Sequence, residues 1–334
     1  MRHGLIPGVV NGCRQGEGED AMRVAVVGVG AVGGYFGGRL AHSGEDVCYI
    51  ARGETLAALQ HGGLRVDSIA GDFVIDPARA FADPAEVGAV DVVLVAVKAW
   101  QVDGLAPTLR SLLHPQTVVV PLQNGVEAAD QLAATLGQEH VAPGVCHIVA
   151  SVEAPGHVRH SGLEPRIAFG ERDNRPSARL ERLQRAFAQA KVKAQIPPDI
   201  GVALWEKFLF IASLSGMGAA TRAPAGVVRR LPETRHLLVQ AIGEVAAVAR
   251  SRGVALPPDA EARTLAFIDA LPEAATSSMQ RDILAGRPSE LEAQLGAVVR
   301  FGAQAGVPTP VAAFLYHVLL PQELQARGSH DRPL

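Results

Sequence analysis

Cysteine is scarce in this chain. Its 334 residues include only three cysteines, Cys13, Cys48 and Cys146. They are far apart in the sequence, odd in number, and lack the Cys-x-x-Cys spacing of zinc and redox sites. The sequence therefore predicts no metal site, and it favours a reduced, cytoplasmic setting.

An excess of charge of one sign is also missing. The chain has 31 basic and 34 acidic residues, and no basic run is longer than Arg229-Arg230. Because nucleic-acid binding needs a clustered positive surface, nucleic acid is not expected as a partner. No stretch reaches the ~20 continuous apolar residues of a spanning helix, so no membrane attachment is expected either. The 48% of hydrophobic residues is enough for two globular cores.

The first 21 residues precede the first expected strand. Their apolar part, residues 4–10, is short, is interrupted by Pro7, and leads into a polar stretch. It therefore does not fit a signal peptide. We expect residues 1–21 to be a disordered extension, and translation could begin at Met1 or at Met22.

A short β-branched stretch runs directly into a Gly-x-Gly-x-x-Gly pattern near the start of the chain. In such a turn Gly28 permits the sharp bend, Gly30 lets a pyrophosphate approach the backbone, and Gly33 lets the next helix pack closely. The alternative is an ordinary glycine-rich turn, but a helix at 31–43 and a strand at 46–51 follow at the expected distance. The pattern therefore predicts a dinucleotide-binding turn. The residues expected at the cofactor here are Gly28, Gly30, Ala31, Val32 and Gly33.

The residue after the second strand bears on the choice of nicotinamide cofactor. NAD sites carry a carboxylate there for the ribose 2′-hydroxyl, whereas this chain has Arg52. A guanidinium can pair with a 2′-phosphate, which an aspartate would repel. In the alternative reading Arg52 is a solvated cation and Glu54 takes the role of the acid. The sequence favours NADPH.

Strand and helix patterns divide the chain into two parts. Apolar runs at 91–97 and 117–122 predict buried parallel strands, and shorter β-like pieces at 140–170 predict antiparallel strands that extend the same sheet. After Pro197-Pro198 only helical periodicity remains, with helices expected at 201–218, 232–252, 258–270 and 289–305. The fold class expected is α/β, a Rossmann-like doubly wound sheet followed by an all-helical domain. The expected parts are the sheet domain at 22–196, the helical domain at 197–325 and a flexible tail at 326–334.

Two polar residues stand where an α/β enzyme places its chemistry, and a third lies in the helical part. Lys98 and Asn124 follow two expected strands, at the carboxyl edge of the sheet. Each could instead be an ordinary loop residue, with Asn124 forming a turn. In the helical part Lys207 lies among large apolar side chains. It either extends to the surface or faces a polar cleft, where it could donate a proton.

Seven short motifs follow one another along the chain. They are the glycine turn, Ala51-Arg52-Gly53, Val97-Lys98-x-x-Gln101, Leu122-Gln123-Asn124-Gly125, Trp205-x-Lys207, Ser277-Ser278-Met279-x-x-Asp282 and Glu290. In this order they resemble ketopantoate reductase (2-dehydropantoate 2-reductase), and the resemblance covers residues 22–325. It implies NADPH-dependent reduction of a 2-oxo acid to a 2-hydroxy acid. The most direct substrate is then 2-dehydropantoate, which is reduced to pantoate in pantothenate biosynthesis.

The same resemblance implies a role for each polar residue. Lys207 is the general acid, and Glu290 orients it and keeps it charged. Ser278 holds the substrate carboxylate, while Lys98 and Asn124 position the nicotinamide ribose and the substrate.

Three positions depart from the family pattern. Family asparagines four and eight residues after the lysine are replaced by Ile211 and Ser215, and a third is replaced by Leu295. Isoleucine cannot hydrogen-bond a polar substrate, so a bulkier or less polar 2-oxo acid is an alternative, with Ser215 keeping one hydroxyl contact. A related dehydrogenase acting on an imine, opine-type or β-hydroxyacid substrate, or a non-catalytic NADPH sensor, also remains possible. The apolar helices at 258–320 could pack internally or form a homodimer.

Overall fold

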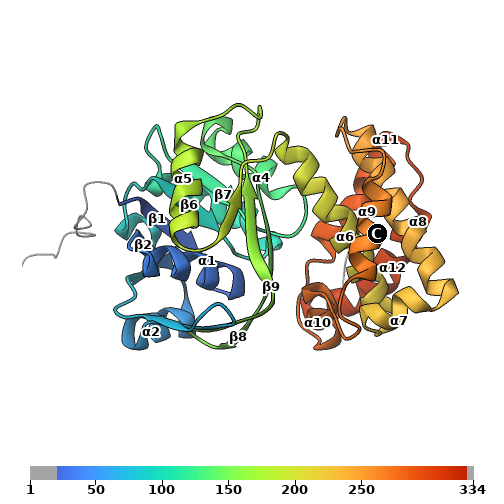
Figure 1. Cartoon of the computed structure of the whole chain (residues 1–334), viewed down its shortest axis with the longest axis horizontal. Helices are drawn as coiled ribbons and strands as arrows, with labels where there is room; N and C mark the ends of the chain where they lie inside the picture. The colour runs from blue at the N-terminus through green and yellow to red at the C-terminus, as the bar shows by residue number, and fades with distance from the viewer. Residues whose placement is uncertain (1–20, 329–334) are drawn as a thin grey trace, which may run out of the picture.

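The computed structural model describes residues 21–328, so the expected extension at 1–20 and the end of the tail at 329–334 lie outside it. Figure 1 shows a part containing both sheets and helices beside a part made of helices. The change falls between strand β10 (Lys193–Gln195) and helix α6 (Ile200–Thr221). The structure is therefore α/β with a helical second part.

The first sheet is parallel throughout, with the strand order β5-β2-β1-β6-β7. All residues of β6 and β7 are buried, because helices cover both faces of the sheet. The order reverses between β1 and β6, and open α/β sheets bind their ligands at such a reversal, outside the carboxyl ends of the strands. The strands are β1 (Arg23–Val27), β2 (Asp46–Ile50), β5 (Ala80–Phe81), β6 (Val92–Val95) and β7 (Val118–Pro121).

Successive residues of these strands point to opposite faces of the sheet and enter two separate cores. Val26 and Leu94 pack with α1 and α5, whereas Val27 and Val95 pack with η3 and α4. The helices of this part are α1 (Ala31–His42), α2 (Gly53–Gly62), α3 (Val102–Leu105), α4 (Ala128–Leu136) and α5 (Ala178–Gln189). Its 3-10 turns are η1 (Pro84–Glu86), η2 (Ala99–Gln101), η3 (Ala106–Leu112) and η4 (Gln138–His140).

A second sheet corrects the expectation for residues 140–170. That region forms two long antiparallel strands, joined by a turn at Pro155-Gly156, and they do not extend the first sheet. They join β3, β4 and β10 instead, and helix α1 lies between the two sheets. Gly162 lies inside β9 at φ +76°, close to a shift in register. The strands are β3 (Leu64–Ser68), β4 (Phe73–Ile75), β8 (Gly144–Ala154), β9 (His157–Phe169) and β10.

Helix α6 is the central element of the helical part. It is long and apolar enough to span a membrane by length and composition, yet most of its apolar window is buried inside the bundle. It packs against α8, α9, α10 and α12 and also touches strand β8 of the sheet part. Its composition is therefore explained by its place in the core. The other elements are α7 (Ala225–Arg230), α8 (Pro232–Ser251), α9 (Ala260–Asp269), α10 (Ser278–Leu284), η5 (Glu292–Gly296), α11 (Ala297–Ala305) and α12 (Pro310–Ala326).

Candidate active site

In the glycine turn between β1 and α1, Gly28 and Gly33 pack closely against other protein atoms, whereas Gly30 does not. Gly28 has φ +91°, and a Cβ placed there would lie 2.7 Å from the amide nitrogen of Val97. A Cβ on Gly33 would lie 2.0 Å from the carbonyl oxygen of Gly28. No atom lies within 4 Å of the corresponding position on Gly30. The backbone at Gly30 therefore leaves room for a ligand to approach.

The start of α1 and the residue Arg52 both suit an anionic ligand. Gly30 caps α1 without a side chain, and the first turn holds no acidic residue, so its amides are not neutralised. Arg52 precedes α2 and is exposed, and its side chain forms no ion pair or hydrogen bond within the described range. These residues fit a phosphorylated dinucleotide. Glu54, the alternative acid, is also exposed in the first turn of α2.

A chain of hydrogen bonds joins three of the expected site residues. The Nζ of Lys207 donates to Oδ1 of Asn124 at 2.8 Å, and Nδ2 of Asn124 donates to Oε2 of Glu290 at 3.0 Å. The backbone nitrogen of Ala99 donates to the other carboxylate oxygen at 3.4 Å. This corrects one expectation, because Glu290 reaches Lys207 through the amide of Asn124 and not directly. The amide orientation follows from its two charged neighbours.

Gln123 holds the loop that carries Asn124, a role that the sequence did not reveal. Its Nε2 donates to the carbonyl oxygens of Val95 and Val97, each at 2.9 Å, and so ties the ends of β6 and β7 together. Gly125 follows at φ +113°, and a Cβ there would lie 2.8 Å from the carbonyl oxygen of Ala293. The loop is therefore packed closely against η5. The position of Gln123 directly after a buried strand was the available signal.

Lys98 was expected at the cofactor and substrate, but here its Nζ pairs with Asp282 of α10 at 2.8 Å. It also lies 5.8 Å from the centre of the Trp100 ring. Arg287 contacts the other oxygen of the same carboxylate at 2.8 Å. Lys98 therefore links the sheet part to the helical part. Asp282 belongs to one of the sequence motifs, but its pairing with Lys98 does not follow from the sequence.

Glu290 is almost fully buried, and the residue before it is firmly anchored. The backbone nitrogen and Oγ of Ser289 donate to Glu323 of α12 at 3.0 and 2.5 Å. Ser289 Oγ in turn accepts from the backbone nitrogen of Leu291 at 3.2 Å. These bonds keep Ser289 and Glu290 outside the helix that had been expected from residue 289, and helical structure begins at η5.

The charge of Lys207 shifts the pKa values of two residues of β8, His147 and Cys146. Burial, followed by the charges of Lys207 and Arg166, lowers the pKa of His147 to about 4. Burial raises the pKa of the Cys146 thiol, while the charge of Lys207 opposes that rise. His147 is thus neutral near pH 7, and Cys146 is a protonated thiol. Neither residue had been foreseen at the site.

The remaining expected substrate residues are distributed between site and core. Ser278 is the first residue of α10 and is half-buried, while its neighbour Ser277 caps the helix. Ile211 and Leu295 both belong to the apolar core of the helical part. Ser215 is fully buried, and no partner for its Oγ lies among residues 21–328.

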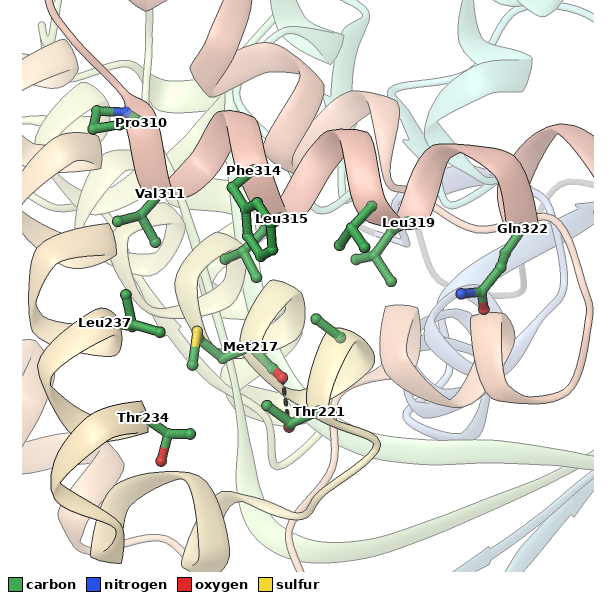
Figure 2. A pocket seen from close by; sticks show the side chains of 12 residues that line it. Met217, Thr221, Thr234, Leu237, Pro310, Val311, Phe314, Leu315, Leu319 and Gln322 are labelled. Carbon is green, nitrogen blue, oxygen red and sulfur yellow. Dashed lines mark hydrogen bonds between the residues drawn. The ribbon is translucent and has the colours of Figure 1, made fainter.

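An apolar groove of about 450 Å³ lies elsewhere, between α6, α8 and α12 (Figure 2). Its lining includes Met217, Leu237 and Phe314 but no titratable side chain. The hydroxyl of Thr221 is already bonded to the carbonyl oxygen of Met217 at 2.7 Å. The groove therefore offers no group for proton transfer, and the candidate site remains at Lys207, Asn124 and Glu290.

Comparisons with known proteins show the family to which the chain belongs. Residues 24–174 match the family described as "Ketopantoate reductase PanE/ApbA", and residues 199–323 match its C-terminal domain. A 2-dehydropantoate 2-reductase of Mesorhizobium japonicum is 34% identical over 86% of this chain and 94% of its own length. An uncharacterized oxidoreductase, YkpB of Bacillus subtilis, is 30% identical over 88% of this chain and 97% of its own. The crystal structure of a Geobacter metallireducens 2-dehydropantoate 2-reductase is 32% identical, covers 90% of this chain and 99% of its own, and superposes with a TM-score of 0.84. The chain belongs to the ketopantoate reductase family of oxidoreductases.

Proposed function

We propose that this protein reduces a 2-oxo acid to a 2-hydroxy acid with NADPH, and that 2-dehydropantoate is its first candidate substrate. The observation that carries the proposal is the hydrogen-bonded series Lys207–Asn124–Glu290, which begins just after the carboxyl end of β7. Several relatives, among them the Mesorhizobium japonicum enzyme, are named 2-dehydropantoate 2-reductases, and this supports the substrate class.

The residues of the glycine turn and Arg52 would hold the cofactor. The amides at the start of α1 suit its pyrophosphate, and the guanidinium of Arg52 suits a 2′-phosphate. When bound, NADPH supplies the hydride that reduces the substrate carbon. This chain's own groups must then supply the proton and fix the geometry.

Lys207 is the proposed proton donor. Its ammonium donates a proton to the carbonyl oxygen as that oxygen becomes an alkoxide, so that one hydride and one proton convert the ketone to a hydroxyl. Asn124 orients Lys207 by accepting its hydrogen bond, and Glu290 orients Asn124 by accepting from its amide. Ser278, at the start of α10, is the proposed contact for the substrate carboxylate.

The test is turnover of NADPH over a series of 2-oxo acids of increasing size. Lys207→Ala should lower turnover by about two to four orders of magnitude, the usual contribution of a positioned general acid, with NADPH affinity preserved. Lys193→Ala, which removes an exposed lysine of β10, is the matched control and should retain normal turnover. Near-normal turnover by Lys207→Ala would refute its assignment as the acid.

A less polar 2-oxo acid, or an imine, is the second candidate substrate. The observation in its favour is Ile211, which lies one helical turn beyond Lys207 and presents no hydrogen-bonding group. A higher kcat/KM for large apolar 2-oxo acids than for 2-dehydropantoate would favour it. Tight NADPH binding without turnover of any substrate would instead indicate a sensor.

A further inference from the structure

Arg327, the residue that follows α12, contacts both parts of the molecule. Its Nε donates to Oε1 of Glu323 at 2.6 Å, and its Nη2 donates to the carbonyl oxygen of Ser289 at 2.9 Å. Its Cζ atom lies over the ring of Trp100, 4.5 Å from the ring centre. Trp100 belongs to η2 of the sheet part, whereas Ser289 and Glu323 belong to the helical part. Arg327 therefore links the two parts.

The shape of the guanidinium group allows both kinds of contact at once. The group is planar, so its face can lie over an aromatic ring while the N–H groups at its edge donate hydrogen bonds. The side chain of Arg327 is 27% exposed, so these contacts are only partly open to water. One side chain thus holds Trp100 and Ser289 at the same time.

Ser289 and Trp100 are the chain neighbours of two residues that bond each other across the two parts. Glu290 follows Ser289, and Ala99 precedes Trp100. The backbone nitrogen of Ala99 donates to Oε1 of Glu290 at 3.4 Å. This distance is longer than that of a strong hydrogen bond, so other contacts must hold the two partners in place. Arg327 supplies such a contact on each side of the bond.

Glu323 fixes the helical side of this arrangement. Its side chain is 4% exposed and accepts from the backbone nitrogen and Oγ of Ser289. A buried carboxylate is costly unless a cation and hydrogen bonds compensate for the lost water, and Arg327 supplies that cation. Removing the guanidinium group would leave the carboxylate of Glu323 without its ion pair, and Ser289 would be held less firmly.

We propose that Arg327 is a positioning residue that holds Glu290 against Ala99 and Asn124. The inference rests on the proposed function, in which Lys207 is the proton donor. Oε2 of Glu290 accepts from Asn124 at 3.0 Å, and Asn124 accepts from Lys207 at 2.8 Å. Each contact fixes the position of the next, so a displacement of Glu290 is passed on to the ammonium group of Lys207. Arg327 thus acts on the reaction through Glu290.

The first experiment measures kcat and KM separately. Arg327→Met keeps most of the side-chain length but removes the planar group and its N–H donors. The kcat for a 2-oxo acid should fall by roughly tenfold to a hundredfold, because small displacements of positioned groups lower rates by that order. The KM for NADPH should stay within about twofold, because the glycine turn and Arg52 are unchanged. A wild-type kcat in Arg327→Met would overturn the proposal.

A double-mutant cycle tests whether Arg327 acts through Glu290. Glu290→Gln keeps the shape of the side chain and removes its charge. If Arg327 serves to position Glu290, adding Arg327→Met to Glu290→Gln should lower kcat by less than about threefold, since the positioned group is already impaired. Losses that multiply would mean that the two residues act independently, and would overturn the proposal.

Arg229→Met is the matched control. Arg229 donates to the carbonyl oxygens of Ile268 and Leu271 at 3.0 and 2.6 Å and to Glu273 at 2.7 Å, all within the helical part. Its replacement should lower the melting temperature at least as much as Arg327→Met does, and leave kcat unchanged. A similar fall of kcat in both variants would assign Arg327 to the stability of the fold and overturn the proposal.

Hydrogen exchange of the Ala99 amide separates this proposal from the proposed function, because it requires no turnover. In Arg327→Met this amide should exchange several times faster, since its acceptor Glu290 and its neighbour Trp100 are both held less firmly. Arg229→Met should leave the exchange rate at the wild-type value. Faster exchange in Arg327→Met alone would support the positioning role even if no 2-oxo acid is reduced and the proposed function fails. An unchanged rate would overturn the positioning role even if 2-oxo acids are reduced.

Discussion

Arg52 stands at the end of β2, exposed and without a side-chain partner among the described residues. Arg52→Ala should weaken NADPH binding by about 1.5–3 kcal/mol, the range for hydrogen bonds to charged groups, and leave NADH binding nearly unchanged. Arg52→Lys should give an intermediate loss, because a lysine keeps the charge but not the bidentate geometry. Fluorescence titration with both cofactors measures the effect. Equal losses for NADPH and NADH would show that Arg52 does not read the 2′-phosphate.

His147 gives the site a pH-dependent contribution to stability. Burial and the charges of Lys207 and Arg166 lower its folded-state pKa to about 4, from an ordinary value of 6.5. The unfolded chain therefore binds the proton more tightly, and this contribution is complete above about pH 6.5 and declines as the pH falls toward 4. The total is at most about 3 kcal/mol.

Urea unfolding between pH 7.5 and 4.5 tests this prediction. His147→Gln should make the free energy of unfolding depend less on pH in that window. The decrease in this free energy at lower pH, which has other causes, should remain. An example of the latter is Glu261, whose pKa is lowered by hydrogen bonds from Arg250. An unchanged slope between pH 6.5 and 4.5 would mean that His147 does not titrate as described.

Sequence patterns identify the candidate site residues better than they identify the partners of those residues. Lys98, Asn124 and Lys207 could be found because a polar side chain after a strand, or inside an apolar helix, is conspicuous. The link from Asn124 to Glu290 could not be found this way. The two residues are 166 positions apart in the chain, and only tertiary packing brings them together.

At the scale of elements, the β1–α1 turn contains two glycines with different expected roles. Gly33 is needed for packing, and Gly30 is the one that we propose for cofactor binding. Gly33→Ala should destabilise the protein or prevent folding, because its Cβ would lie 2.0 Å from the carbonyl oxygen of Gly28. Gly30→Ala should keep the melting temperature within a few degrees, since no atom lies within 4 Å of the new Cβ, but should weaken cofactor binding. Thermal unfolding and NADPH titration of both variants measure these effects. Unimpaired NADPH binding by Gly30→Ala would place the pyrophosphate elsewhere.

The same turn shows which parts of the fold are predictable. A buried strand, a glycine turn and a helix form one local unit, so the β1–α1–β2 order could be read directly from the sequence. The second sheet could not, because β9 pairs in parallel with β3, about 90 residues earlier in the chain. Strand β3 is short, with alternating exposure, and gives only a weak local signal. Whether a segment forms a strand is set mainly by its own residues. Which strand it pairs with depends on residues far away in the chain.

At the scale of the whole molecule, the candidate site lies where the two parts meet. Asn124 and Lys98 come from the sheet part, and Lys207, Glu290 and Asp282 come from the helical part. The hydrogen-bonded series is therefore complete only when the two parts are held together. The ion pair between Lys98 and Asp282 is one of the contacts that hold them.

Asp282→Asn tests whether that ion pair helps to hold the sheet part and the helical part together. We call the arrangement in which the two parts are in contact the closed arrangement. The Lys98 side chain is 43% exposed, so the pair contributes little to folding, about 0–1 kcal/mol, and the melting temperature should change by only a few degrees. We expect kcat/KM to fall by roughly threefold to tenfold, because the closed arrangement is less populated. Added salt should lower kcat/KM of the wild type, because salt screens the attraction between Lys98 and Asp282. Asp282→Asn lacks this attraction, so its kcat/KM should depend less on salt.

Asp269→Asn is the matched control for that experiment. It removes the pair between Asp269 and Arg235, with contacts of 2.6 and 2.8 Å, which is exposed and lies entirely within the helical part. If Asp282 helps to hold the two parts together, Asp269→Asn should lower the melting temperature about as much as Asp282→Asn does. Its kcat/KM, and the dependence of kcat/KM on salt, should stay at wild-type values. Equal behaviour of the two variants would mean that the Lys98–Asp282 pair is an ordinary surface contact, and that Asn124 and the packing of η5 against Gly125 hold the two parts together.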